Sequence, residues 1–265
     1  MRIQIEHITT FTYDRPISEA YTEMNLRPLD GNGQHCLSFD LANETQDEIL
    51  TYRDRFGNTV HHFDVIQPHQ KLVVAAKSEV ITPDSFFQAQ DRLSPLDEYD
   101  FLAGSSFAPL NRGIVQFAAA HASHNDPKAA ALSLMQAVSE ALKYEKGATD
   151  VTTTAEQALD LGRGVCQDFA HVMLAACRSV GIPARYVSGY LNSEGHNAAS
   201  HAWVDVYLRG QGWISLDATH NREQTAQYVR VATGRDYGDV PPTRGIFVGD
   251  AREEMEVTVK VKILA

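Results

Sequence analysis

Residues 162–183 read GRGVCQDFAHVMLAACRSVGIP and predict a tight glycine turn that leads into a helix. Apolar residues recur here at the i, i+3, i+4, i+7, i+8 and i+11 spacing of a helix packed on one face, namely Phe169, Val172, Met173, Ala176, Cys177 and Val180. Gly181 suits the left-handed residue that ends a helix, and Pro183 prevents continuation. Cys166 stands at the helix start, so its sulfur is expected on the packed face.

A cysteine at the start of a helix is suited to nucleophilic chemistry. The first N–H groups of a helix are unpaired and carry partial positive charge, which stabilises a thiolate. The thiolate is the nucleophilic form of cysteine. Gly162 and Gly164 allow a sharp turn and a close approach of substrate to the backbone. The alternative is a buried apolar cysteine, which is the common fate of this residue type. The partner residues decide between the two.

The composition places the chain among globular proteins. Its 265 residues, 43% hydrophobic and 22% charged, are enough for one large domain or two ordinary ones. The formal net charge of −11 argues against nucleic acid and against a membrane as partners. The N-terminal segment lacks the apolar core of a signal peptide. The three scattered cysteines do not form a disulfide framework, and we expect a reducing, cytoplasmic location.

The chain divides into a β-rich part and a part with helices. Residues 1–82 contain short alternating runs with turn signals, such as Phe56-Gly57-Asn58, and predict an N-terminal β-sandwich. Residues 83–111 are poor in periodicity and rich in proline, and are expected to be a linker. Residues 112–265 are expected to form the catalytic core. Helices are predicted in this core from Arg112, from Asp126-Pro127, and from Thr153 or Thr154 to Gly162.

A hairpin follows the cysteine helix and carries the partner residues. A thiolate nucleophile needs a base, and the base needs an acceptor that orients it. His201 lies early in the strand SHAWVDVYL, and Asp217 lies late in the strand WISLDATH. The two side chains share a face only if the loop around Gly210 has an odd number of residues, or if a bulge restores the parity. Cys166, His201 and Asp217 are therefore the predicted catalytic residues.

Three motifs together resemble the core of the transglutaminase-like superfamily in its bacterial form. They are GVCQDFAHVMLAACRSVGIPARYVSGYL, SHAWVDVYL and GWISLDATHN, within about residues 160–221. The N-terminal strands also resemble the β-rich domain that precedes this core in bacterial members. The resemblance implies an α+β fold in which a β-sandwich precedes a papain-like core of helices on an antiparallel sheet or barrel. It also implies a Cys166 nucleophile, a His201 base and acid, and an orienting Asp217, acting through a thioester acyl-enzyme without a cofactor.

The motifs differ from those of the animal cross-linking enzymes. Those enzymes carry a GQCW-type motif, whereas Val165 precedes the cysteine here and Gln167 follows it, and the chain shows no calcium loop. We therefore expect hydrolysis of a peptide, protein or amide substrate by a cysteine peptidase or amidase. A transglutaminase that transfers the acyl group to an amine is the first alternative. A non-catalytic binding domain is the second.

Other residues have weaker assignments. Gln167, Trp203 and Tyr190 are candidates for substrate binding, although large strand residues more often lie in the core. Asp168 is expected to favour the first helical turn, and His171 to lie on a less buried flank of the helix. A zinc site built from Cys166 with His171, His196 or His201 has only one cysteine available. No CxxC or HExxH spacing supports a metal site at His61-His62 with His35 and His69. We expect no metal and assign no oligomeric state.

Overall fold

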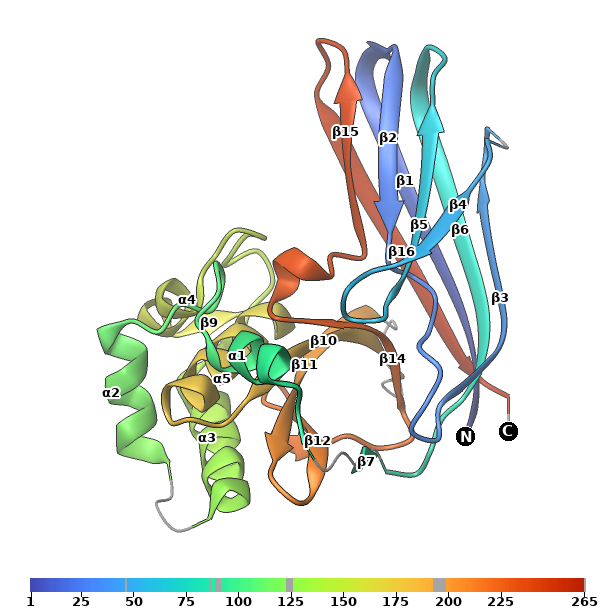
Figure 1. Ribbon diagram of the computed structural model, residues 1–265. Helices are drawn as coiled ribbons and strands as arrows, with labels where there is room; N and C mark the ends of the chain where they lie inside the picture. The colour runs from blue at the N-terminus through green and yellow to red at the C-terminus, as the bar shows by residue number, and fades with distance from the viewer. Residues whose placement is uncertain (46, 86, 89–91, 123–125, 193–198, 265) are drawn as a thin grey trace.

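The computed structural model describes residues 1–45, 47–85, 87–88, 92–122, 126–192 and 199–264. Two stacked antiparallel sheets stand beside a third antiparallel sheet that is covered by helices (Figure 1). The expected α+β fold, with a β-rich N-terminal region and helices packed on an antiparallel sheet, is confirmed. None of the helices in the described ranges is both long enough and apolar enough to cross a membrane.

The two stacked sheets form a sandwich of four strands each. The first has the strand order β16 (Glu253–Ile263), β1 (Arg2–Ile17), β6 (His69–Ile81) and β3 (His35–Asn43). The second has the order β15 (Thr243–Val248), β2 (Glu19–Met24), β5 (Thr59–Val65) and β4 (Leu50–Arg53). Burial alternates along most of β1, as it does when one face of a strand packs on a core. The predicted turn at Phe56-Gly57-Asn58 joins β4 to β5, and Gly57 has a φ of +83°.

The strand pairing differs from the predicted division of the chain at residue 112. β16 pairs antiparallel along β1, from Ile3 opposite Ile263 to Tyr13 opposite Glu253, and β15 pairs with β2. The C-terminal chain therefore returns to the sandwich, and the two termini lie close together (Figure 1). This return satisfies backbone groups of β1 and β2 that would otherwise form open sheet edges. Long-range pairing of this kind leaves no signal in local periodicity.

The segment predicted as a linker, residues 83–111, is partly ordered secondary structure. β7 (Phe87–Gln88) pairs with β12 (Gly212–Asp217), and α1 (Pro95–Leu102) begins after Ser94, whose side chain accepts the Asp97 N–H. Phe101 of α1 is buried and meets the Trp213 ring edge to face at 5.4 Å. The segment thus packs on the hairpin side of the third sheet.

The third sheet and its helices form the part that bears Cys166. Its strands follow the order β13 (Arg222–Glu223), β12, β11 (Ala199–Leu208), β10 (Ala184–Leu191) and β14 (Tyr228–Gly234). The main helices are α2 (Arg112–His121), α3 (Pro127–Ala141), α4 (Ala155–Leu161) and α5 (Cys166–Ser179). Smaller elements are β8 (Lys143–Tyr144), β9 (Arg163–Gly164) and the 3₁₀ turn η1 (Tyr237–Asp239). The predicted caps Asp126 and Thr154 begin α3 and α4.

Helix α5 lies at the centre of this part. One side contacts β10 and β11, and α2, α3 and α4 contact other sides. Every residue from Asp168 to Arg178 is buried. The helix ends as predicted, with Gly181 at a φ of +78°.

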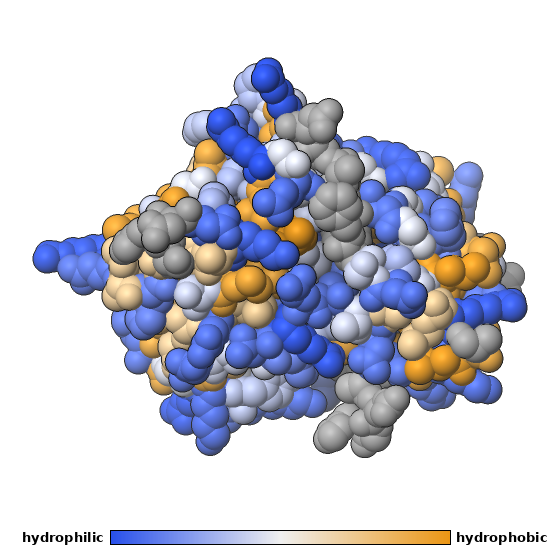
Figure 2. Space-filling view, turned by 90° about the horizontal axis from the view of Figure 1, so that it is seen from below, coloured by the Kyte–Doolittle hydropathy of each residue, from blue (hydrophilic) through white to orange (hydrophobic). Residues whose placement is uncertain are grey.

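The first sheet packs on two different partners along its length. Phe11 and Tyr13 of β1 belong to the core between the two sandwich sheets, whereas Ile3 and Ile5 belong to the core that contains α5. The segment of β1 between these two pairs of residues, around His7, therefore lies at the junction between the sandwich and the part that contains α5. The face of the molecule in Figure 2 is mostly hydrophilic, and its apolar residues form small separate groups.

Two buried amide side chains join the sandwich to the outer edge of β14. The Asn58 amide donates to the Thr233 carbonyl and accepts the Thr233 N–H, each at 2.8 Å. Gln34 makes the same pair of bonds with the backbone of Arg230, each at 2.9 Å. These amides take the place of a neighbouring strand, so this edge is satisfied from the other part of the molecule.

The Asn58→Ala substitution should lower the free energy of unfolding by about 2–3 kcal/mol, because it leaves buried backbone groups of Thr233 without partners. Urea denaturation followed by circular dichroism measures this difference. The matched control is Gln70→Ala, since the Gln70 side chain is exposed, and it should change stability by less than about 0.5 kcal/mol. Equal stability of the two variants would show that the amide does not hold this edge.

Candidate active site

Cys166 is held at the first position of α5 by a buried carboxylate. Asp168 accepts the Val165 N–H and the Thr149 hydroxyl, each at 2.7 Å, and this caps the helix start. A Cβ on Gly164 would come within 2.4 Å of the Asp168 carboxylate. Gly164 is therefore needed to make room for Asp168, whereas Gly162 has the left-handed conformation, with a φ of +66°, that ends α4.

The hairpin places His201 and Asp217 on one face. Leu208 lies opposite Gly212, so a loop of three residues joins β11 to β12. The predicted odd-length loop is confirmed. The Nε2–H of His201 donates to Oδ2 of Asp217 at 2.8 Å, and both residues are buried. Since Nε2 is used in this way, Nδ1 is the nitrogen left for Cys166, with which His201 also hydrogen-bonds.

The Asp217 carboxylate is surrounded by hydrogen-bond donors. Oδ2 accepts from His201, from Nδ1 of His220 at 2.7 Å and from the Tyr228 hydroxyl at 2.6 Å. Oδ1 accepts the Thr219 N–H at 2.9 Å. Burial would raise the pKa of Asp217, but the hydrogen bonds from His201, His220 and Tyr228 outweigh it and hold the pKa well below its ordinary value. The carboxylate is therefore ionised at neutral pH.

The charge of His201 follows from these contacts. Burial alone would lower the pKa of His201, but the hydrogen bonds to Asp217 and Cys166, together with their negative charges, outweigh burial and raise the pKa to about 10. The imidazole is therefore protonated at neutral pH in this arrangement. A protonated imidazole hydrogen-bonded to a cysteine at a helix start is an arrangement suited to a nucleophile and its proton donor.

Of the three predicted substrate-binding residues, one reaches the cavity beside Cys166. This cavity has a volume of about 250 Å³, and its lining includes Cys166, Gln167 and His201. Trp203 and Tyr190 do not line it, and both are buried. Trp203 stacks on His201 with ring centroids 5.9 Å apart, and a Cβ on Gly189 would strike its ring. Trp203 lies on the same strand face as His201 but is packed between His201 and Gly189, so it holds the imidazole in place and does not contact the cavity.

Tyr190 supports a histidine that sequence reasoning did not single out for the site. His7 of β1 lines the cavity, and its Nδ1 lies 2.9 Å from the Tyr190 hydroxyl. Its Nε2 lies 3.2 Å from the Thr9 hydroxyl. Burial lowers the pKa of His7 to about 4, so this imidazole is neutral. A buried histidine in a strand more than 150 residues before Cys166 carries no local signal of this role.

His220 and Tyr228 are the other site residues that the sequence left unassigned. His220 lies three residues after Asp217, and this spacing within DATH was a usable signal, because a turn brings such a side chain back to the carboxylate. Tyr228 lies on β14 and reaches Asp217 only through the sheet order.

The zinc alternative finds little support in this geometry. His171 is buried, not on a less buried flank as expected, because Phe107 stacks on it at 5.3 Å and its Nε2 accepts the Tyr237 N–H. Burial lowers the pKa of His171 to about 3. His196 lies outside the described residues. Among the described residues, the group of potential metal ligands is His201, Asp217 and His220, and it does not include Cys166. The hydrogen bonds of His201 and His220 to Asp217 explain why these three side chains lie close together.

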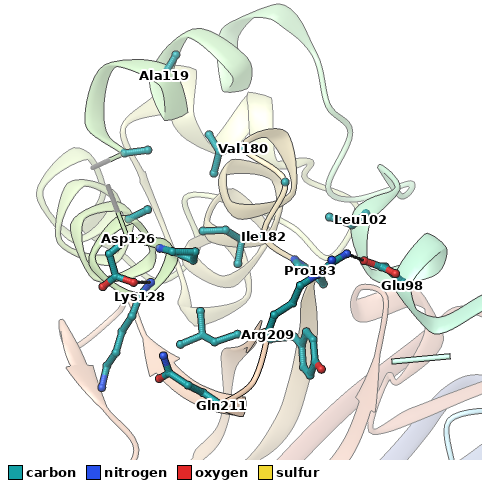
Figure 3. Close-up of a pocket in the computed structure, with 16 residues that line it drawn as sticks. Glu98, Leu102, Ala119, Asp126, Lys128, Val180, Ile182, Pro183, Arg209 and Gln211 are labelled. Carbon is teal, nitrogen blue, oxygen red and sulfur yellow. Dashed lines mark hydrogen bonds and ion pairs between the residues drawn. The ribbon is translucent and has the colours of Figure 1, made fainter. Parts of the chain in front are cut away.

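A larger cavity, of about 630 Å³, lies at the opposite end of α5 (Figure 3). Val180, Ile182 and Pro183 line it, and Arg209 pairs with Glu98 at 2.6 Å on its border. Neither a thiol nor an imidazole is found among its described lining residues. Of these two cavities, the smaller one has both a thiol and an imidazole among its described lining residues.

Comparison with known proteins agrees with this geometry. Residues 115–218, which include Cys166, His201 and Asp217, match the family model of the transglutaminase-like superfamily. Residues 3–81 match that of the bacterial transglutaminase-like N-terminal region. An uncharacterized protein of Mycobacterium leprae is 31% identical over 280 residues, which cover 100% of this chain and 99% of the relative.

Two further similarities concern proteins with a described activity or a solved structure. The protein-glutamine gamma-glutamyltransferase of Pseudomonas aeruginosa is 33% identical over 109 residues, which cover 37% of this chain and 16% of that enzyme. A crystal structure of a candidate cysteine protease from Cytophaga hutchinsonii superposes with a TM-score of 0.81 at 24% identity, covering 100% of this chain and 91% of that one. The latter shows that the fold is shared.

Gly164→Ala should displace Asp168 and loosen the helix start, because the added methyl group meets the carboxylate. We expect a loss of about 1–3 kcal/mol in the free energy of unfolding and slower alkylation of Cys166 by iodoacetamide. The control is Gly113→Ala in α2, because a Cβ at Gly113 would have no neighbouring atom closer than 3.7 Å. This control variant should be at least as stable as the parent protein. If both variants behaved like the parent, the close packing of Asp168 on Gly164 would not matter.

Proposed function

Because the chain belongs to the transglutaminase-like superfamily, we propose that it is a cysteine-dependent acyl-transfer enzyme that hydrolyses a peptide or amide bond with Cys166, His201 and Asp217. The observation that supports this most directly is the buried His201–Asp217 pair beside a cysteine at a helix start. Each member has a partner suited to its role: the helix start for the thiolate, the carboxylate for the imidazole, and several donors for the carboxylate.

In the acylation step, the thiolate of Cys166 attacks the carbonyl carbon of the substrate and forms an S–C bond. The carbonyl oxygen takes the negative charge, and the backbone N–H of Cys166, at the unpaired helix start, is its proposed donor. His201 then gives its Nδ1 proton to the leaving nitrogen. The C–N bond breaks, the amine departs, and a thioester with neutral His201 remains.

In the second step, the neutral His201 takes a proton from the incoming nucleophile. Water attacks the thioester carbonyl, the C–S bond breaks, and the thiolate and the imidazolium form again with release of a carboxylic acid. Asp217 keeps the imidazole oriented throughout, because Nε2–H stays bonded to Oδ2. An amine in place of water would give a new amide by the same proton transfers.

We propose hydrolysis over amine transfer because of the residue that follows the nucleophile. Gln167 stands where animal cross-linking enzymes carry tryptophan, and it lines the cavity with a polar side chain whose amide donates to the Val151 carbonyl at 3.1 Å. Transfer requires that the site hold the amine and exclude water, since water is present at about 55 M. We further propose that the enzyme acts in a reducing compartment such as the cytoplasm, where its thiols stay free.

Intact-mass analysis tests the proposed reaction. The protein incubated with p-nitrophenyl esters or peptide amides should gain an acyl adduct on Cys166, and Cys166→Ala should gain none while remaining folded. Addition of a primary amine at millimolar concentration should yield mostly acid and little amide. Incorporation of amine severalfold above hydrolysis would replace this proposal with a transglutaminase. Adducts on Cys36 or Cys177 instead would remove Cys166 from its role.

The pH profile tests the ion pair. His201 must be protonated to assist the leaving group, so kcat/KM should fall as the pH rises through about 10, where His201 loses its proton. Asp217→Asn removes the negative charge that raises this pKa, so the fall should move to lower pH and the activity should decrease. Tyr228→Phe removes one hydrogen bond to Asp217 but keeps the carboxylate charge. In this variant the decrease in kcat/KM should not move to lower pH. An Asp217→Asn profile that falls at the same pH as the parent would contradict the assignment.

A further inference from the structure

The cavity beside Cys166 has walls from both parts of the molecule. Tyr186 and Ala202 of the third sheet line one side. The other side comes from the returning C-terminal chain, through Met255 and Val257 of β16. β16 lies outside both family-matched spans, so this wall is a contribution of the remaining chain.

Strand pairing explains why Met255 and Val257 point toward the cavity. They lie opposite Phe11 and Thr9 of β1, whose side chains are buried on the inner face of the first sheet, and paired residues share a face. Yet Met255 is 51% exposed and Val257 is 42% exposed. Here the sheet passes from one core to the next, so these apolar side chains face the opening beside the nucleophile. An apolar group placed against them would remove unfavourable hydrated surface.

The described lining offers no counter-ion to a charged ligand. Apart from the proposed catalytic pair of Cys166 and His201, no described lining residue bears a formal charge, and His201 is already paired with Asp217. His7 is neutral, and both of its ring nitrogens have hydroxyl partners. A charged group would lose its hydration here without an ion partner. The polar lining side chains, among them Ser188, Ser200 and Thr243, are neutral.

We propose, on the basis of the function proposed above, that this cavity holds the acyl group of the substrate, and that Met255 and Val257 select an uncharged, largely aliphatic one. The cavity volume of about 250 Å³ lies just below the range of about 300–1,000 Å³ that is typical of small-molecule pockets. It therefore accommodates one side chain or a short acyl chain, and the rest of the substrate lies outside it.

Three activated esters of similar acyl length test this selectivity. They are p-nitrophenyl butyrate, the anionic p-nitrophenyl monoester of glutaric acid, and the cationic p-nitrophenyl ester of 4-(trimethylammonio)butyrate. The burst of p-nitrophenolate, with the mass of the Cys166 adduct, gives the acylation rate. Butyrate should acylate Cys166 about tenfold faster than either charged ester. The cationic ester separates this effect from the general repulsion of anions by a chain of net charge −11.

Substitutions on β16 then assign the selectivity to its residues. Met255→Lys and Val257→Lys should each raise the glutaryl to butyryl rate ratio by about tenfold, because each supplies a counter-ion. The control is Thr258→Lys, on the exposed opposite face of the same strand, which should leave the ratio unchanged. A charged ester as fast as butyrate in the parent protein, or ratios unmoved by both cavity variants, would overturn the inference. If no ester modified Cys166, the proposed function would fail and this inference with it.

Discussion

The ionised carboxylate of Asp217 is the constraint on which the site depends. A buried charge is costly unless it is paired and hydrogen-bonded. Here the cost is offset by His201, His220, Tyr228 and a backbone N–H. These donors come from β11, from β14 and from the turn after β12, so the carboxylate fixes the positions of three segments at once. The same contacts that stabilise the charge also orient the imidazole toward Cys166.

The ion pair couples the stability of the fold to pH. His201 has a pKa in the folded protein above its ordinary value of 6.5, and Asp217 has one below its ordinary value of 3.8. The pair therefore stabilises the folded state fully between these two ordinary values. Its contribution declines as the pH rises from 6.5 toward 10, and as the pH falls below 3.8. The protonated His201 that the proposed acylation requires thus persists up to about pH 10, whereas the pair's contribution to stability already declines above pH 6.5.

What the sequence could predict is what depends on short-range geometry. The helix of Cys166, its end at Gly181, and the shared face of His201 and Asp217 follow from periods of 3.6 and 2 residues, which act over one element or one hairpin. The return of β15 and β16 to the sandwich depends on pairing across more than 200 residues, and no period records it. The sequence alone does not tell whether Trp203 binds substrate or lies in the core, because aromatic strand residues occur both in cores and in grooves. The close packing of Gly189 against its ring shows that Trp203 lies in the core.

The same long-range pairing explains why the cavity lies where it does. β1 is long enough to serve two cores, with Phe11 in one and Ile5 in the other, and the two cores do not meet. The cavity beside Cys166 lies next to His7, and β16 reaches it because β16 pairs with β1 residue by residue. Cys166 reaches this cavity because α5 begins at the edge of its own core. The cavity is thus a consequence of joining two cores through one continuous sheet, and changes in β16 can alter its walls without disturbing the hydrogen bonds of Asp217.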